Sequence, residues 1–159
     1  MIRLSFRSAL AAPADVVWAK VSTMAGVNDE LHPWMYMTVP ASFAQRSLQD
    51  LTPAQLQGVL FHSLLLALRC IPLDVHALQL SRLLPGEGFN EHSRSWMQKS
   101  WIHRRRVTAD AEGCIVSDEL AIEPRLIWMA PLIRWAVAAL FRHRHRRLAE
   151  TFGSRKLAA

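Results

Sequence analysis

The fold of this chain is decided by three stretches near its end, SWIHRRRV at 100–107, GCIVSDELAI at 113–122 and LFRHRHRRL at 140–148. The first two alternate apolar and polar residues, as half-buried β-strands do. The third belongs to a helical pattern over residues 126–152, which Gly153 ends. Two strands with ionisable residues on apolar-looking faces, followed by one long helix, indicate a curved sheet that grips a helix over a cavity with a polar floor.

The sequence around these stretches predicts further strands and helices. Before residue 40 we expect a strand over 2–10, a helix over about 14–22, a short helix over Gly26–Leu31 and an extended segment over Trp34–Val39. From residue 73 onward we expect strands over Val75–Leu84, Phe89–Gln98, Lys99–Thr108 and Cys114–Glu123.

The segment from 40 to 72 is the least regular part of the pattern. Thr52 and Pro53 are typical of a helix start. The apolar run Val59–Ile71 fits either a helix or a buried strand, and we favour the helix. With 159 residues, 51% hydrophobic and 20% charged, the chain is expected to form one domain over 1–159, with a frayed tail from about 154.

The charge and the cysteine content limit which partners and which cellular compartment we expect. The net charge of +6 is concentrated at 103–106 and 142–147, which supports a nucleic-acid surface less than a charge spread over one face would. Cys70 and Cys114 lie in apolar runs without metal-binding spacing, so we expect two buried free thiols in a reducing compartment. The N-terminus is too short for a signal peptide, and we expect a cytoplasmic protein that binds no nucleic acid.

The order strand, two helices, antiparallel strands and long C-terminal helix resembles the helix-grip fold of the START-like (SRPBCC) superfamily. The resemblance rests on APADVVW at 12–18, WIHR at 101–104, VSDEL at 116–120 and FRHRHRRL at 141–148. It implies an α+β fold in which a curved antiparallel sheet wraps around a long C-terminal helix. The superfamily includes birch-pollen-allergen-like proteins, polyketide cyclases/dehydrases and lipid-transfer domains, so the fold leaves the function open.

Alternation along the strands decides which ionisable residues face the interior. The faces expected to lie inside carry Trp101, His103, Arg105 and Val107 on one strand, and Cys114, Val116, Asp118, Leu120 and Ile122 on the next. On the strand before them we favour the face with Phe89, Glu91, Ser93, Ser95 and Met97, although Trp96 on the other face argues against it.

A stripe on the C-terminal helix should face the sheet. It consists of Ile133, Val137, Phe141, Arg144, Leu148 and Phe152. A buried cation without a partner is costly, so we expect Arg144 or His143 to meet Asp118 or Glu91. Three roles stay open for this group: a structural ion pair, a polar floor that orients a ligand, or a proton-transfer pair of His103 and Asp118.

Other chemistries have no motif in the sequence. It contains no GxGxxG, GxxxxGK[ST] or GxSxG pattern, so nucleotide cradles and a nucleophile elbow are unsupported. His143 and His145 lie two positions apart, on roughly opposite sides of a helix, so we expect no metal site and no cofactor.

The basic cluster Arg142–Arg147 has three interpretations. It complements the negative end of a helix, it forms a patch for RNA or DNA, or it contacts an anionic membrane to collect or deliver a lipid. The apolar lead-in 126–141 is shorter than the roughly 20 residues that a membrane-spanning helix needs.

We therefore expect a binding protein or carrier for one hydrophobic small molecule, such as a lipid, polyketide or isoprenoid-like compound, of undetermined oligomeric state. The residues expected to contact it are Trp34, Tyr36, Trp96, Trp101, Leu120, Val137 and Phe141 as walls, and Glu91, His103, Asp118 and Arg144 as polar anchors. The alternative is a polyketide cyclase or dehydratase that uses His103 and Asp118. A third hypothesis is a non-catalytic protein with a filled interior, whose basic helix end docks to an acidic partner.

Overall fold

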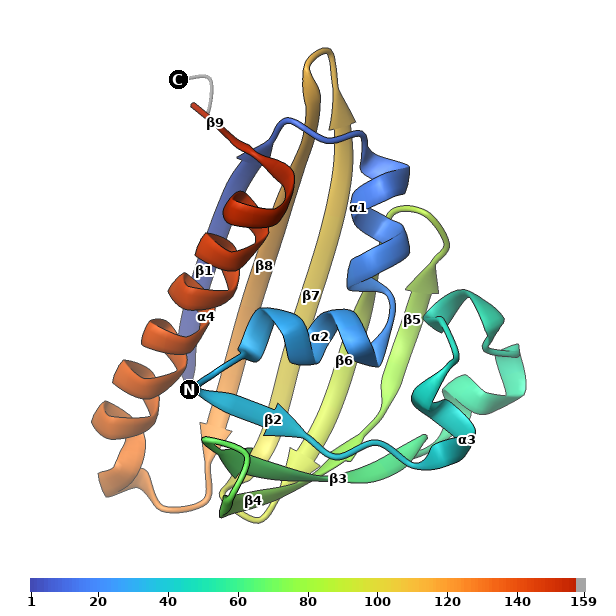
Figure 1. Ribbon diagram of the computed structural model, residues 1–159. Coiled ribbons are helices and arrows are strands. Elements are labelled where there is room, and N and C mark those ends of the chain that lie inside the picture. Colours follow the sequence, from blue (N-terminus) through green and yellow to red (C-terminus); the bar gives the residue numbers. More distant parts are fainter. Residues whose placement is uncertain (157–159) are drawn as a thin grey trace.

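One curved antiparallel sheet and the long helix α4 (Ala130–Phe152) form the two main layers of a computed structural model, which describes residues 1–156 (Figure 1). The strands follow the order β2-β3-β4-β6-β7-β8-β1-β9, and β5 pairs with β6. The predicted α+β helix-grip fold is thereby confirmed.

The strands are β1 (Ile2–Leu10), β2 (Met35–Met37), β3 (Phe61–Ala67), β4 (Ile71–Leu78), β5 (Leu80–Leu84), β6 (Gly88–Ser95), β7 (Gln98–Asp110), β8 (Gly113–Pro124) and β9 (Ser154–Arg155). The other helices are α1 (Ala14–Val21), α2 (Met24–Leu31) and α3 (Ala41–Ala44), with 3-10 turns η1 (Leu48–Asp50), η2 (Pro53–Gln57) and η3 (Ile127–Met129). None of the helices within residues 1–156 is long and apolar enough to cross a membrane.

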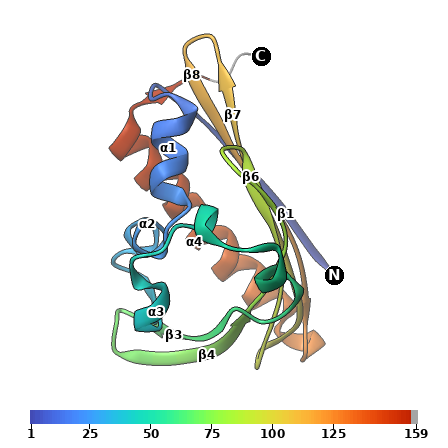
Figure 2. The same ribbon diagram turned by 90° about the vertical axis from the view of Figure 1, so that its right-hand side faces the viewer.

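The helices cover one face of the sheet. Figure 2 shows α1, α2 and α4 on the same side of β1, β6, β7 and β8, with β3 and β4 curling beneath them. The interior faces of β6, β7 and β8 are those that the alternation predicted, since Glu91, His103 and Asp118 are all buried. The same holds for the stripe on α4, which buries Val137 and Phe141 against the sheet.

Local chemistry explains where the helices begin and end. The Thr23 hydroxyl accepts a hydrogen bond of 3.0 Å from the backbone N–H of Gly26 and so caps α2. A proline stands in the first turn of α4, and Gly153 follows the helix with a φ of 78°, which favours glycine.

Three expectations about the elements were wrong. The run Val59–Ile71 contains strand β3 rather than a helix, because β2 and β4 pair with it on both sides. The strand expected over Val75–Leu84 is divided into β4 and β5 at Gln79. Each half pairs with a different part of β6, so the chain bends between them.

The third difference concerns the end of the described chain. Ser154 and Arg155 are not frayed, because they pair with Ala9 and Leu10 of β1. Residues 157–159 of the expected frayed tail lie outside the described residues. The two thiols also differ from each other: Cys114 is buried, whereas Cys70 is exposed because it lies in the turn between β3 and β4.

Candidate functional site

A cavity of about 160 Å³ lies between α2, the β2–β4 part of the sheet and α4. Its lining is mainly apolar and includes Val21, Met24, Val27, Leu31, Met35, Met37, Leu48, Leu65, Leu78, Leu80, Phe89, Trp101, Val137, Leu140 and Phe141. Its polar lining consists of Ser22, Thr23, His76, Glu91, Gln98, His103 and Arg144. The cavity therefore combines apolar walls with ionisable groups from three strands and α4.

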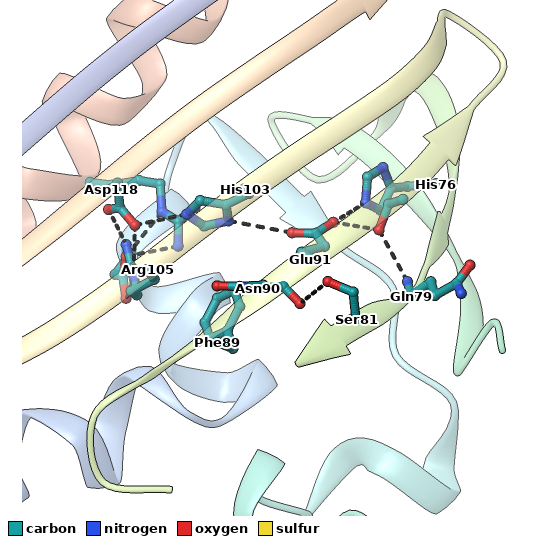
Figure 3. A network of polar contacts seen from close by, with 12 residues as sticks. His76, Gln79, Ser81, Phe89, Asn90, Glu91, His103, Arg105 and Asp118 are labelled. Atoms are coloured by element: carbon teal, nitrogen blue, oxygen red, sulfur yellow. Dashed lines mark hydrogen bonds and ion pairs between the residues drawn. The ribbon is translucent and has the colours of Figure 1, made fainter. Parts of the chain in front are cut away.

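The carboxylate of Glu91 is the centre of the polar lining. Its Oε1 accepts hydrogen bonds from His76 Nε2 at 2.7 Å and from the Ser93 hydroxyl at 2.6 Å. Its Oε2 lies 3.3 Å from His103 Nδ1. Figure 3 shows these side chains in a row, with His103 between Glu91 and Asp118.

His103 has a carboxylate at each of its ring nitrogens. Nδ1 faces Glu91, and Nε2 lies 2.7 Å from Oδ1 of Asp118. A neutral imidazole donates from one nitrogen only, whereas an imidazolium donates from both. The geometry therefore fits the charged form. Burial lowers the pKa of His103, but Asp118 and Glu91 together raise it above its ordinary value.

A second set of buried charges lies behind His103. The Arg105 guanidinium donates to both oxygens of Asp118 and to both oxygens of Glu30, at 2.8 to 2.9 Å. Burial raises the pKa of Asp118 and of Glu30, yet the adjacent Arg105 lowers both below their ordinary values. His145 Nε2 lies 3.0 Å from Oδ2 of Asp118, the oxygen that also accepts from Arg105 Nη2.

Arg144 joins this network at the cavity. Its Nε donates to Oε2 of Glu30 at 3.0 Å, and its Nη2 lies 2.9 Å from the same oxygen as an ion pair. The expectation that Arg144 or His143 would meet Asp118 or Glu91 was wrong, because α2 inserts Glu30 between α4 and the sheet. His143 instead lies 2.7 Å from the backbone carbonyl of His32.

The charges of this network balance. Three carboxylates, on Glu30, Glu91 and Asp118, face two guanidiniums, on Arg105 and Arg144. A charged His103, with His76 and His145 neutral, makes the sum zero, which is the arrangement that buried ions require.

The residues expected to contact a ligand divide into two groups. Glu91, Trp101, His103, Val137, Phe141 and Arg144 line the cavity. Trp34, Tyr36, Trp96, Asp118 and Leu120 do not.

Each residue outside the lining has its own surroundings. Trp34 and Trp96 are exposed, since Trp96 lies in the turn after β6 and Trp34 lies before β2. The Tyr36 ring is 4.9 Å from the Arg69 guanidinium. Asp118 is enclosed behind His103, and Leu120 packs in a separate apolar cluster with Ile122 and Phe141.

Sequence reasoning missed His76, Arg105, His145 and Glu30 as members of the network. Arg105 had a signal, because it alternates with Trp101, His103 and Val107 on an inward face. Glu30 had a weaker one, since it follows Val27 by one helical turn. The sequence predicts one strand over Val75–Leu84, whereas β4 spans Ile71–Leu78. The local pattern therefore does not mark His76 as a member of the network.

Some polar atoms of the interior have no partner. Within residues 1–156, the buried atoms Trp18 Nε1, Ser63 Oγ and Gln98 Oε1 make no hydrogen bond. Of these residues only Gln98 lines the cavity. The same described residues contain no group of three His, Cys, Asp or Glu side chains placed to hold a metal ion.

Comparisons with known proteins agree with the fold. A family model described as "Domain of unknown function (DUF8410)" matches residues 8–152. No curated protein matches the sequence. The crystal structure of protein CV1439 from Chromobacterium violaceum is similar over 96% of this chain and 99% of that chain, at 15% identity and a TM-score of 0.69.

Two further solved structures are similar. A START superfamily protein from Mycobacterium smegmatis matches over 94% of this chain and 96% of its own, at 11% identity and a TM-score of 0.63. DynU16, a protein of the dynemicin biosynthetic locus, matches over 97% of this chain and 49% of its own, at 12% identity and a TM-score of 0.57. The resemblance to the START-like superfamily is thereby confirmed, and at these identities it concerns the fold alone.

Proposed function

Since the chain belongs to the family described as "Domain of unknown function (DUF8410)", whose name assigns no activity, we propose from the geometry of the site that the protein binds and carries a small hydrophobic molecule with one polar or acidic group. One observation carries the proposal: an apolar cavity between the sheet and α4 that is polar around Glu91 and Arg144. Apolar walls with a few polar groups are typical of small-molecule sites.

The volume limits the size of the ligand. An apolar cavity of about 150 Å³ takes a guest the size of benzene, and pockets for drug-sized ligands span about 300–1,000 Å³. The 160 Å³ found here suits one aromatic ring or a short hydrocarbon chain. A lipid or polyketide larger than this would require lining side chains to move.

Arg144 is the proposed anchor for the polar group of the ligand. Two of its nitrogens bind Glu30, while Nη1 makes no hydrogen bond to any residue in the described part of the chain. The two N–H groups of Nη1 suit a carboxylate or carbonyl oxygen. Arg105 keeps Glu30 paired, so replacing Arg144 leaves no buried carboxylate without a cation.

The alternative, a cyclase or dehydratase, is favoured by the short contact of 2.7 Å between His103 and Asp118. Two features argue against proton transfer by this pair. A His103 that donates to two carboxylates has no lone pair with which to act as a base. Asp118 is fully buried and held by Arg105, so it does not reach the cavity. Nitrogen NMR of His103 tests this: a neutral ring at pH 7 would restore the enzyme hypothesis.

The first experiment is mass spectrometry of the purified protein, native and then denatured with solvent extraction. We expect release of one small apolar molecule per chain. Binding is then measured with benzoate, an aromatic carboxylate of one ring, and with benzene, its uncharged counterpart.

Two variants test the cavity and the anchor separately. Val137→Phe adds bulk to the cavity wall and should abolish binding of both probes, whereas Val16→Phe, on the exposed face of α1, should leave it unchanged. Arg144→Ala should weaken the binding of benzoate about 10–100-fold and that of benzene little, because only the carboxylate loses a charge-assisted hydrogen bond. The exposed Arg142→Ala is the matched control. Equal losses for both probes would make Arg144 a structural residue only.

A further inference from the structure

The start of α4 exposes a group of large apolar side chains that the cavity does not use. Leu126, Ile127, Trp128, Leu132 and Trp135 are between 49% and 76% exposed. A surface helix ordinarily has one apolar stripe, which faces the core. Here Ile133 and Val137 fill that stripe, so Leu132 and Trp135 form a second apolar face toward solvent. Contiguous apolar surface of this kind marks an interaction site.

Trp96 lies at the same end of the molecule. It is 75% exposed and follows β6, whose turn into β7 lies beside the connection from β8 to α4 (Figures 1 and 2). Arg125 links the two segments, since its backbone N–H donates to the Met97 carbonyl at 2.9 Å and its Nε donates to the Ser95 carbonyl at 3.1 Å.

The turn that presents Trp96 is held in place by hydrogen bonds. Oδ1 of the buried Asp74 accepts from the backbone N–H of Trp96 at 3.0 Å. The exposed indole therefore stands on a fixed backbone. We call Trp96, Leu126, Ile127, Trp128, Leu132 and Trp135 the apolar end.

The charge beside the apolar end is mainly positive, and its nearest exposed acid, Glu123, is paired with Lys99. Residues 125–149 contain no Asp or Glu. Arg125 and Arg134 are exposed within the apolar end, and Arg142 and Arg146 continue the outward face of α4 beyond it. An amphipathic helix with Trp and Leu on its exposed face and arginines beside them is the pattern of segments that lie in the interface of an anionic membrane.

We propose that the apolar end docks this protein onto an anionic membrane surface, with its tryptophans at the level of the lipid headgroups and Arg142 and Arg146 over the phosphates. A second copy of the chain fits this surface less well, because two such faces would bring their arginines together. The proposal goes beyond ligand binding: the wall residues Val137 and Leu140 lie on the next turns of α4, so docking would place the cavity close to the membrane.

The test is flotation of the purified protein with vesicles of phosphatidylcholine alone and of phosphatidylcholine with phosphatidylglycerol. No cavity ligand is added, so the result is independent of the benzoate experiment. We expect at least tenfold stronger binding to the anionic vesicles, weakened by salt. Tryptophan emission should shift to the blue on binding.

The double variant Trp128→Ala and Trp135→Ala should reduce vesicle binding tenfold or more. Trp34→Ala removes an indole that is 59% exposed and lies outside the apolar end, and this variant should bind as the parent protein does. Three results would overturn the proposal: no binding to either vesicle, the same loss with Trp34→Ala, or a dimer in solution that the double variant dissociates. The last result would assign the surface to a second copy of the chain.

Discussion

Arg105 is the residue at which the buried charges of the two layers meet. It lies on the inward face of β7 and is fully buried, and its guanidinium binds Asp118 of β8 and Glu30 of α2 at the same time. Removing one partner of a buried ion pair leaves an uncompensated charge, which costs far more than the loss of a surface pair. Replacing one carboxylate of this network therefore tests how much the network stabilises the fold.

Glu30→Gln should lower the free energy of unfolding by about 3–5 kcal/mol, because Arg144 loses its carboxylate and Arg105 loses one of its two. Urea denaturation measures the loss. Asp29→Asn is the control: the preceding residue of α2 is an acid whose pairs with Lys20 and Arg147 are partly exposed, and its loss should cost about 1 kcal/mol or less. Similar losses in both variants would contradict the role assigned to Glu30.

His103 should make the stability depend on pH with a definite sign. Because its folded-state pKa is raised above the ordinary 6.5, its contribution is complete below pH 6.5 and is lost as pH rises through the raised value. The pKa values of Glu30 and Asp118 are lowered, so their contributions are present above their ordinary 4.5 and 3.8 and are lost in acid.

Stability should therefore be greatest between about pH 4.5 and 6.5. His103→Gln should remove much of the loss at higher pH, whereas His92→Gln, an exposed histidine on β6, should leave the profile unchanged. Thermal unfolding across pH 4 to 10 measures this. A parent protein whose stability rises steadily above pH 6.5 would contradict a charged His103.

At the scale of elements, the junction of α1 and α2 positions Glu30. The two helices are joined through Ser22 and Thr23, and α2 comes so close to α1 that a Cβ on Gly26 would overlap the backbone carbonyl of Lys20. The absence of a side chain at Gly26 therefore sets the angle at which α2 delivers Glu30 to the sheet.

Gly26→Ala should destabilise the protein by about 1–3 kcal/mol, although alanine is favoured over glycine inside a helix by roughly 1 kcal/mol. Gly58→Ala is the control, because its backbone is extended and no atom lies within 4 Å of the added Cβ. That variant should be neutral or gain up to about 1 kcal/mol. Chemical denaturation of both variants measures these changes in stability. A gain in stability for Gly26→Ala would mean that α1 and α2 separate at little cost.

At the scale of the whole molecule, the sheet has two parts that are weakly joined. β6, β7, β8 and β1 pair along most of their lengths, whereas β4 pairs with β6 only through His76 and Ala77. The β2–β4 part supplies Met35, Met37 and Leu65 to the cavity. A part that is held by few hydrogen bonds opens more readily than the rest.

Backbone amides of β2 and β3 should therefore exchange with deuterated water faster than those of β7 and β8. Binding of benzoate should slow exchange in β2–β4 more than in β8, because the ligand would bridge the two parts. Exchange measured by mass spectrometry tests both statements. Uniform exchange over all strands would show that the sheet opens as one unit.

The sequence by itself determined the strands β6, β7 and β8, the inward faces of Glu91, His103 and Asp118, and the stripe on α4. These features follow from the local spacing of apolar and polar residues, which can be recognised within a few residues of the sequence. It also supported the START-like fold through the order of the elements. It left open whether the apolar run around β3 was helix or strand, because periodicity alone cannot separate a buried strand from a buried helix.

Only the tertiary structure decided the partners of the buried charges. Arg144 needed an acid, and the sequence offered several; Glu30, 114 positions away, fills the role because the α1–α2 junction carries it to the sheet. The same holds for the apolar end, since the spacing of residues shows which side of a helix is apolar but not which side the sheet will cover. Pairing across long sequence separations depends on how the layers pack, and no local pattern records that packing.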